Sequence, residues 1–289
     1  YDEQGRQNMV KSAEGTITRT VYDGMGRVVS TWVGTDDTGA THEDPSGGGG
    51  GTNNMLMVSQ NVYDNGGAGD GNLTASIVYT SGSAARETDY FYDWRNRVVA
   101  TKSGIALTYD SGTQTWSAAT EATSDNSHPI AYTTYDNLGE TLTSQSYDGD
   151  TVTITTTDGV PVAPDASLLR SETTMSYDAL GRVYKTSMYS VDPSDGTVSS
   201  GSIDTKTYYD AVGQVLETIA SGAAATKYSY DGAGRVTTIY TTDGGAVNNS
   251  GTPLDSVADA ASVGADIVLQ QVEYAYDADG NTLMTTTRQ

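Results

Sequence analysis

The chain contains no cysteine, a single phenylalanine, and only 15 basic residues against 37 acidic ones. Without cysteine it can form no disulfide, thiolate metal site or cysteine nucleophile. The net charge of −22 repels phosphate, so a nucleic-acid partner is not expected. No apolar run approaches the ~20 residues of a membrane-spanning helix. The chain opens on Tyr1-Asp2 with no signal peptide, and we expect it to be a fragment of a larger protein.

Tyrosine is abundant instead, with 20 residues, and nine of them begin a repeated box with the pattern Y-D-x-x-G-R-V. The fullest copies begin at Tyr22, Tyr177 and Tyr230, and altered copies begin at Tyr1, Tyr63, Tyr92, Tyr135, Tyr209 and Tyr276. The shortest spacing is 21 residues, and the longer gaps indicate the same unit carrying insertions. The residues assigned a structural role in the boxes are Tyr22, Asp23, Gly26, Arg27, Tyr92, Asp93, Arg97, Tyr135, Asp136, Gly139, Tyr177, Asp178, Gly181, Arg182, Tyr209, Asp210, Gly213, Tyr230, Asp231, Gly234, Arg235, Tyr276, Asp277 and Gly280.

Each box predicts the tip of a β-hairpin. Asp opens a turn because its side chain can accept from the backbone two residues on, and Gly three positions later supplies a positive φ. Asn96, which replaces Gly in one box, is among the few other residues that tolerate this conformation. The segments after the boxes, such as 28–32 and 236–240, are rich in β-branched and aromatic residues and are short enough for single strands.

The organisation predicted is one array over residues 1–289 in which the insertions are surface loops or small extra hairpins. The best helix candidate is Pro253–Val263, which is rich in alanine. The insertions lie near residues 34–54, 111–128, 148–167, 191–202 and 243–266.

The nine boxes resemble the YD repeat, also called the RHS (rearrangement hotspot) repeat, along the whole chain from Tyr1 to Asn281. The resemblance implies an all-β fold of stacked β-hairpins in one continuous spiralling sheet, as a solenoid, shell or fibre. It also implies a non-catalytic structural role in a large extracellular or cell-surface protein, as a shell wall or filament. A toxin-encapsulating cage fragment and a glycan- or cell-binding adhesin are the alternatives. The partners expected are further repeats, identical chains, glycans or an enclosed cargo.

Candidate chemistry is sparse, and no enzyme is predicted. His42 and His128 are the two histidines, and each lies in an insertion with no partner motif. A calcium site is the one metal candidate, because Asp64, Asn65, Asp70 and Asn72 gather hard oxygen ligands in a glycine-rich loop. Turn propensity explains the same residues equally well, and no other cofactor is expected. Trp32, Trp94 and Trp116 are the candidates for a carbohydrate-binding platform.

The box residues themselves are interpreted as architecture, because a site repeated in every turn is better explained by stacking than by catalysis. We expect each box Tyr to stack on the equivalent Tyr of a neighbouring hairpin. The arginines Arg27, Arg97, Arg182 and Arg235 are expected to pair with box Asp residues of an adjacent turn.

Overall fold

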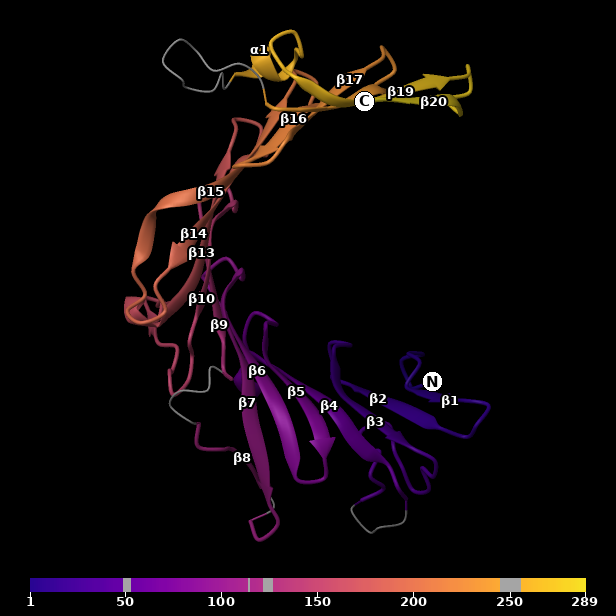
Figure 1. Ribbon diagram of the computed structural model, residues 1–289. Coiled ribbons are helices and arrows are strands. Elements are labelled where there is room, and N and C mark those ends of the chain that lie inside the picture. The colour runs from indigo at the N-terminus through magenta and orange to yellow at the C-terminus, as the bar shows by residue number, and fades with distance from the viewer. Residues whose placement is uncertain (49–52, 114, 122–126, 245–255) are drawn as a thin grey trace. The chain divides into compact units, whose positions relative to one another are not determined.

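The computed structural model describes residues 1–48, 53–113, 115–121, 127–244 and 256–289, and antiparallel strands make up most of it (Figure 1). The prediction of an all-β chain of stacked hairpins is confirmed. Contacts divide the chain into two compact units. Unit 1 comprises Tyr1–Thr133, Gln145–Arg170 and Pro193–Gly196, and unit 2 comprises Thr134–Ser144, Ser171–Asp192 and Thr197–Gln289.

In unit 1 each strand pairs with the next one along the chain, from β1 to β8, and β9 also pairs with β7. Two strands, β11 and β12, form a separate small sheet. The strands are β1 (Met9–Lys11), β2 (Ile17–Tyr22), β3 (Val28–Gly34), β4 (Leu56–Tyr63), β5 (Leu73–Ser81), β6 (Ala84–Tyr92), β7 (Val98–Asp110), β8 (Thr115–Ala118), β11 (Thr156–Thr157) and β12 (Val160–Pro161), together with β9 (Ile130–Tyr135) and β10 (Thr141–Tyr147), which contribute residues to both units.

Unit 2 repeats the arrangement, with every strand from β13 to β20 antiparallel to its neighbours in sequence. One short helix, α1 (Val257–Ala260), precedes β19. The strands are β13 (Leu169–Tyr177), β14 (Val183–Val191), β15 (Val198–Tyr209), β16 (Val215–Ala220), β17 (Ala225–Tyr230), β18 (Val236–Thr242), β19 (Val268–Tyr276) and β20 (Thr282–Arg288).

The boxes form the hairpin tips, as predicted. In the box that joins β2 to β3, the Gly26 N–H donates to the Asp23 carbonyl at 3.0 Å, and Gly26 has φ +86°. Asn96 has φ +60°, so the substitution of Asn for Gly keeps the same turn. The strand register shifts by one residue just before each of these turns, for example between Val21 and Tyr22, which is a β-bulge.

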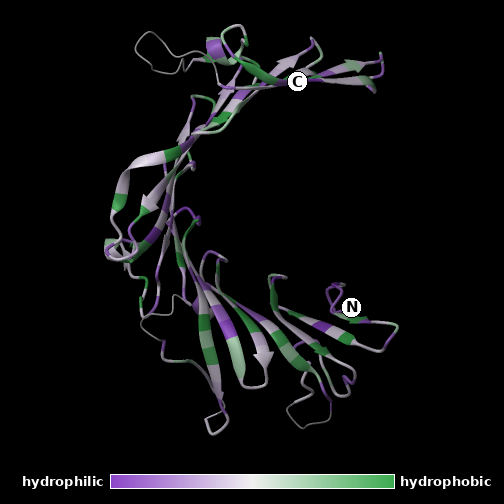
Figure 2. Ribbon diagram, viewed as in Figure 1, coloured by the Kyte–Doolittle hydropathy of each residue, from purple (hydrophilic) through white to green (hydrophobic). Residues whose placement is uncertain are grey.

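Hydrophobic and hydrophilic positions are interspersed along the strands (Figure 2), so the buried core is small. In unit 1 it centres on Ile77, Ala85, Ile105 and Leu107 of β5, β6 and β7. Trp116 of β8 packs against this cluster and lies 5.1 Å from the Tyr79 ring and 5.3 Å from the Tyr109 ring. The strand β8 belongs to the 111–128 insertion, so this insertion adds apolar cover to the sheet.

The other insertions also carry small elements. The 148–167 insertion holds β11, β12 and most of a 3-10 helix, η2 (Ala166–Leu168). The helix predicted over Pro253–Val263 is shorter than expected, since α1 covers Val257–Ala260, and its predicted start lies outside the described residues. Helices of the length and apolar character needed to cross a bilayer are absent from the described part of the chain.

Candidate functional site

The Asp of each box organises its own turn. In the box at Tyr22, Asp23 Oδ1 accepts from the backbone N–H groups of Met25 and Arg27, both at 2.9 Å. The other carboxylate oxygen, Oδ2, accepts from Arg27 Nε at 2.7 Å. One carboxylate therefore satisfies two loop amides and fixes an arginine four residues on. The same two backbone bonds are made by Asp2, Asp93, Asp136, Asp178, Asp210, Asp231 and Asp277.

These contacts lower the pKa of most box carboxyl groups. For Asp178 the largest cause is the Arg182 side chain, followed by the Arg182 backbone N–H, while burial opposes them. The native chain therefore binds fewer protons than the unfolded chain around the ordinary Asp pKa of about 3.9. At Asp2, Asp23, Asp93 and Asp136 burial is the largest single cause and raises the pKa, but the hydrogen bonds together lower it. At Asp231 the Arg235 backbone N–H, and at Asp277 the Asn281 side chain, is the largest cause of a lowered pKa.

We predict that Asp178→Asn destabilises the chain in a pH-dependent manner. Because the folded pKa of Asp178 is lowered, its contribution is present above the unfolded pKa and is lost as the pH falls through the folded value. The difference in urea midpoint between wild type and variant, followed by circular dichroism, should be largest near neutral pH and shrink below about pH 4. A difference that stays constant down to strongly acidic pH would contradict the assignment.

The prediction that the box arginines pair with box Asp residues of an adjacent turn is wrong for the main partner of each arginine. Arg27, Arg97, Arg182 and Arg235 each bind the Asp of their own box, at Nε–Oδ2 distances of 2.7 to 2.8 Å. The contact with the next box is made by the outer end of the guanidinium. Arg6 Nη1 donates to the Asp23 carbonyl at 3.1 Å, Arg235 Nη1 donates to the Asp277 carbonyl at 3.3 Å, and Arg27 Nη1 lies 3.4 Å from the Asp64 carboxylate.

Arginine also covers the tyrosine ring of the next box, where a ring of another tyrosine was expected. The guanidinium carbon lies 4.2 to 4.7 Å from the ring centroid, which is cation–π geometry. Four arginines thus join two boxes each, since each binds the Asp of its own turn and the Tyr of the following turn. The pairs are Arg6 with Tyr22, Arg27 with Tyr63, Arg182 with Tyr209 and Arg235 with Tyr276.

The tyrosine hydroxyl completes the junction and explains why the box begins with Tyr instead of Phe. Tyr276 Oη donates to the Val236 carbonyl at 2.7 Å, and Val236 immediately follows the arginine that covers the Tyr276 ring. A phenylalanine would leave this part-buried carbonyl without the bond. The equivalent bonds run from Tyr22 to Gln7, Tyr63 to Val28, Tyr92 to Leu73, Tyr177 to Thr141, Tyr209 to Val183 and Tyr230 to Val215.

Tyr276→Phe should therefore lower the free energy of unfolding of unit 2 by about 1 kcal/mol, the net value of one such hydrogen bond. Urea denaturation followed by circular dichroism measures this loss. The control is Tyr184→Phe, because Tyr184 is exposed and lies outside the boxes. Equal effects of the two changes would show that the hydroxyl of Tyr276 does not stabilise the junction.

In two boxes the glycine lies against a side chain of the preceding box. A Cβ on Gly181 would lie 2.9 Å from Glu140 Oε1, and a Cβ on Gly234 would lie 3.0 Å from Gln214 Nε2. The box at Tyr92 has Asn96 at this position, and here the preceding box supplies the shorter Asn72, whose Nδ2 donates to Asn96 Oδ1 at 2.9 Å. Where Asn replaces Gly in one box, the shorter Asn thus replaces Glu or Gln in the preceding box.

This matching predicts a coupled pair of substitutions. Gly234→Asn alone should destabilise unit 2, because the new side chain meets Gln214. Adding Gln214→Asn reproduces the Asn72–Asn96 pair and should recover about 0.5–1 kcal/mol of the loss. The double-mutant cycle is measured by urea denaturation with circular dichroism, and strictly additive effects would contradict the matching.

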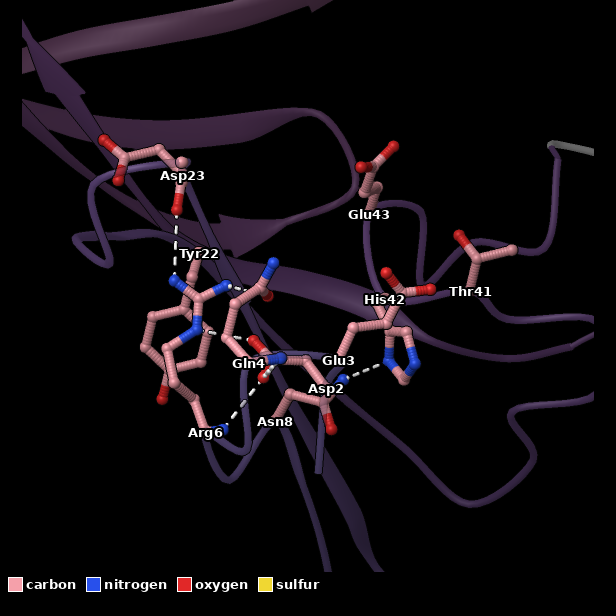
Figure 3. Close-up of a pocket in the computed structure, with 11 residues that line it drawn as sticks. Asp2, Glu3, Gln4, Arg6, Asn8, Tyr22, Asp23, Thr41, His42 and Glu43 are labelled. Carbon is pink, nitrogen blue, oxygen red and sulfur yellow. Dashed lines mark hydrogen bonds and ion pairs between the residues drawn. The ribbon is translucent and has the colours of Figure 1, made fainter.

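One junction forms a pocket of about 380 Å³ between the first two boxes and the insertion near residues 34–54 (Figure 3). Arg6 lies across it, bonded to Asp2, to Gln4 Oε1 at 3.0 Å and to the Asp23 carbonyl at 3.1 Å. His42 Nδ1 lies 2.5 Å from Asn8 Nδ2 at the other end. The polar groups drawn in Figure 3 therefore largely bind one another, as at the other junctions.

The stretched box at Tyr63 contains the candidate calcium ligands. Asp64 Oδ1 accepts from the Gly71 and Asn72 N–H groups at 2.9 and 3.1 Å, and Asn72 Nδ2 is bonded to Asn96. Asp64 thus performs the turn-closing role of a box Asp. In the described residues no three or more His, Asp or Glu side chains gather as a metal cluster would require. Calcium binding by Asp64, Asn65, Asp70 and Asn72 stays a prediction from the sequence.

The structure brings together one set of residues that resembles a catalytic triad in composition. His128 Nδ1 lies 2.9 Å from both Ser127 Oγ and Asp150 Oδ1. In a Ser-His-Asp triad the serine and the aspartate contact opposite ring nitrogens, so this is a different arrangement. His128 is buried and ties the end of the 111–128 insertion to the 148–167 insertion.

The candidate carbohydrate-binding tryptophans do not form one platform. Trp116 packs against the unit 1 core, and Trp32 Nε1 donates to Ser30 Oγ at 2.9 Å. Trp94 is 72% exposed at a hairpin tip, beneath the Arg95 guanidinium at 4.6 Å. A glycan-binding role stays a prediction from the sequence.

Comparison with known families gives the repeat its name. The model described as RHS Repeat matches residues 209–246, which include the boxes at Tyr209 and Tyr230. Residues 209–246 therefore carry the RHS repeat. The boxes outside the matched residues make the same turn, arginine and tyrosine contacts.

One solved structure is similar to the chain in fold. A crystal structure of TcdB2, TccC3 and Cdc42 aligns with 98% of this chain at 16% identity and a TM-score of 0.54. This chain spans only 11% of that chain's length. A Photorhabdus luminescens Tc holotoxin pore aligns with 99% of the chain, and the chain with 15% of it, at 14% identity and a TM-score of 0.28, which is too low to support a structural argument. A search of curated proteins finds no match to the sequence.

Proposed function

We propose that this chain is a non-catalytic wall segment of a larger secreted or cell-surface protein, in which RHS hairpins stack into a β-shell. The observation that carries the proposal is the repeated junction. Arg, Asp, Tyr and Gly are the chemically distinctive residues of the boxes. Asp shapes its own turn and positions the Arg, and Arg, Tyr and Gly make the contacts between one hairpin and the next. Because these side chains are engaged in the same structural contacts at successive turns, few of them are available as catalytic groups.

The charge of the chain supports a wall exposed to solvent. The net charge of −22 favours solubility and opposes nonspecific association between copies. The sheet edges of each hairpin are covered by the next hairpin, which protects backbone groups that would otherwise pair with other chains. The likeness to the TcdB2, TccC3 and Cdc42 structure is one of fold, and enclosure of a cargo by this chain's parent protein is part of the proposal.

The test is electron microscopy of the intact native protein by negative staining. Hollow particles with a thin wall would support the proposal. Long uniform filaments would contradict it and would favour a fibre built from the same junctions. Protease treatment of the particles adds an independent readout, because a cargo enclosed by the wall should survive until the wall itself is cut.

A further inference from the structure

A buried lysine lies beneath the 243–266 insertion of unit 2. Lys227 of β17 and Glu217 of β16 are directly opposite each other in the strand register, so their side chains share one face of the sheet. Lys227 Nζ donates to the carbonyl oxygens of Asp259 and Ser262 at 2.9 and 2.8 Å. Helix α1 lies over β15 and β16 here and buries Ala260 (Figure 1). The lysine therefore holds the described end of the insertion against the sheet.

The same lysine nitrogen lies 2.8 Å from Asp266 Oδ2, and the two side chains are only 3% and 2% exposed. This contact does not have hydrogen-bond geometry, and among the described residues Asp266 Oδ2 has no hydrogen-bond partner. An amine and a carboxyl group are thus in contact, shielded from water, with an oxygen left unsatisfied. Burying an ion pair in this way is costly unless its hydrogen bonds are complete.

Unit 1 contains a matched case with ordinary geometry. Lys102 Nζ donates to both carboxylate oxygens of Glu121 at 2.8 and 2.9 Å and to the Val152 carbonyl at 2.8 Å. This buried lysine also secures insertions to the sheet, but its carboxylate partner is fully hydrogen-bonded. The unsatisfied oxygen of Asp266 therefore distinguishes the Lys227–Asp266 pair from the Lys102–Glu121 pair.

We propose that Lys227 and Asp266 form an intramolecular isopeptide bond, with Glu217 transferring protons during its formation. The three groups needed are present on one buried face: an amine, a carboxyl carbon beside it, and a second carboxyl opposite the amine. Holding two reacting groups in contact replaces a bimolecular encounter with an intramolecular step, which can contribute an effective concentration of about 10⁵ M or more. Amide formation also removes both buried charges.

The atoms balance without any co-reactant. A proton passes from the Lys227 ammonium to the Asp266 carboxylate, which leaves a neutral amine and a neutral acid. Nζ then attacks Cγ, Glu217 carries a second proton from nitrogen to the departing oxygen, and the Cγ–O bond breaks. One hydrogen stays on the amide nitrogen, and two leave with the oxygen as a water molecule.

Glu217 suits a proton-transfer role. Burial is the main cause that raises its pKa, the negative charges of Asp266 and Asp259 add to the rise, and Lys227 opposes it. A carboxyl group with a raised pKa can both accept and return a proton nearer to neutral pH. The bond would fix the 243–266 insertion to β17 by a covalent link in addition to the hydrogen bonds of Lys227.

Mass spectrometry of the purified full chain tests the proposal. The intact mass should be lower than the sequence mass by one water molecule. Trypsin should fail to cut after Lys227 and should release a branched product that joins residues 207–235 to residues 236–288. An unmodified intact mass with normal cleavage after Lys227 would overturn the proposal, and so would a water loss that maps to other residues.

Variants separate bond formation from folding. Asp266→Ala and Lys227→Met should have their full sequence masses, with circular dichroism reporting whether the strands are retained. Glu217→Gln keeps the size of the side chain and should slow the loss of water after refolding by about 10²-fold. The control is Glu121→Gln, which alters the matched pair of unit 1 and should leave the loss of water unchanged. Bond formation by Glu217→Gln at the wild-type rate would overturn the assigned role of Glu217.

Discussion

Gly196→Ala should lower the free energy of unfolding of unit 1 by about 4 kcal/mol. Gly196 lies at the tip of the 191–202 insertion with φ +74°. A Cβ there would lie 1.8 Å from the Ala166 carbonyl oxygen of η2, far inside van der Waals contact. The backbone conformation and the close approach both exclude a side chain, so the two insertions would have to separate.

Gly201→Ala is the control for this change. Gly201 lies close by in the same insertion, its φ is not positive, and among the described atoms nothing lies within 4 Å of its ideal Cβ position. We expect an effect within about 0.5 kcal/mol. Urea denaturation followed by circular dichroism is the measurement, because Gly196 belongs to unit 1 and Gly201 to unit 2, and the strands of both units contribute to the signal. Similar urea midpoints for the two variants would mean that the insertions do not pack as described.

Asp93→Ala is expected to destabilise unit 1 by about 3 kcal/mol. Asp93 and Asp2 have the lowest described side-chain exposure among the box aspartates, 5% each, and of the two only Asp93 is buried as a whole residue. Its carboxylate accepts from the backbone N–H groups of Arg95 and Arg97 and from Arg97 Nε. Alanine leaves these donors without their acceptor and also frees the arginine that Asp93 positions.

Two further variants make the Asp93 experiment specific. Asp279→Ala changes an exposed carboxylate in the loop of another box and should have little effect. Asp93→Asn keeps one acceptor oxygen for the loop amides but loses the charge that binds Arg97. Its loss of unfolding free energy should therefore fall between those of Asp93→Ala and Asp279→Ala. Urea denaturation followed by circular dichroism gives the free energies, because Asp93 belongs to unit 1 and Asp279 to unit 2, and the signal reports on the strands of both. An Asp93→Ala variant as stable as Asp279→Ala would show that the carboxylate does not organise its turn.

The turns and strands could be predicted from the sequence because they depend on local rules. Asp and Gly at fixed positions specify the hairpin loop, and Asn96 follows the same rule with its φ of +60°. The β-branched segments after the boxes became β3, β14, β16 and β18. Nine copies of one pattern then implied stacking, since a single hairpin cannot bury its own faces.

The partners within the junction could not be read from the pattern. The box Arg is close in sequence to its own Asp, yet the box alone does not say whether a neighbouring Asp competes for it. Contacts such as Tyr276 with Val236 span 40 residues and depend on how hairpins lie side by side. The buried lysines Lys102 and Lys227 gave even less signal, because a lysine in a strand is ordinarily exposed to solvent.

The junction between boxes gives any run of these hairpins two unlike ends. In each junction Arg and a backbone carbonyl come from the earlier box, whereas the Tyr ring, its hydroxyl and the Gly come from the later one. The end that presents Arg and the carbonyl is complementary to the end that presents Tyr and Gly, and it is not complementary to a copy of itself. Two identical ends brought together across a twofold axis would leave these Arg and Tyr contacts unmade, because a twofold interface requires a self-complementary patch. The full set of contacts forms only where hairpins follow one another head to tail, as they do within the wall proposed above.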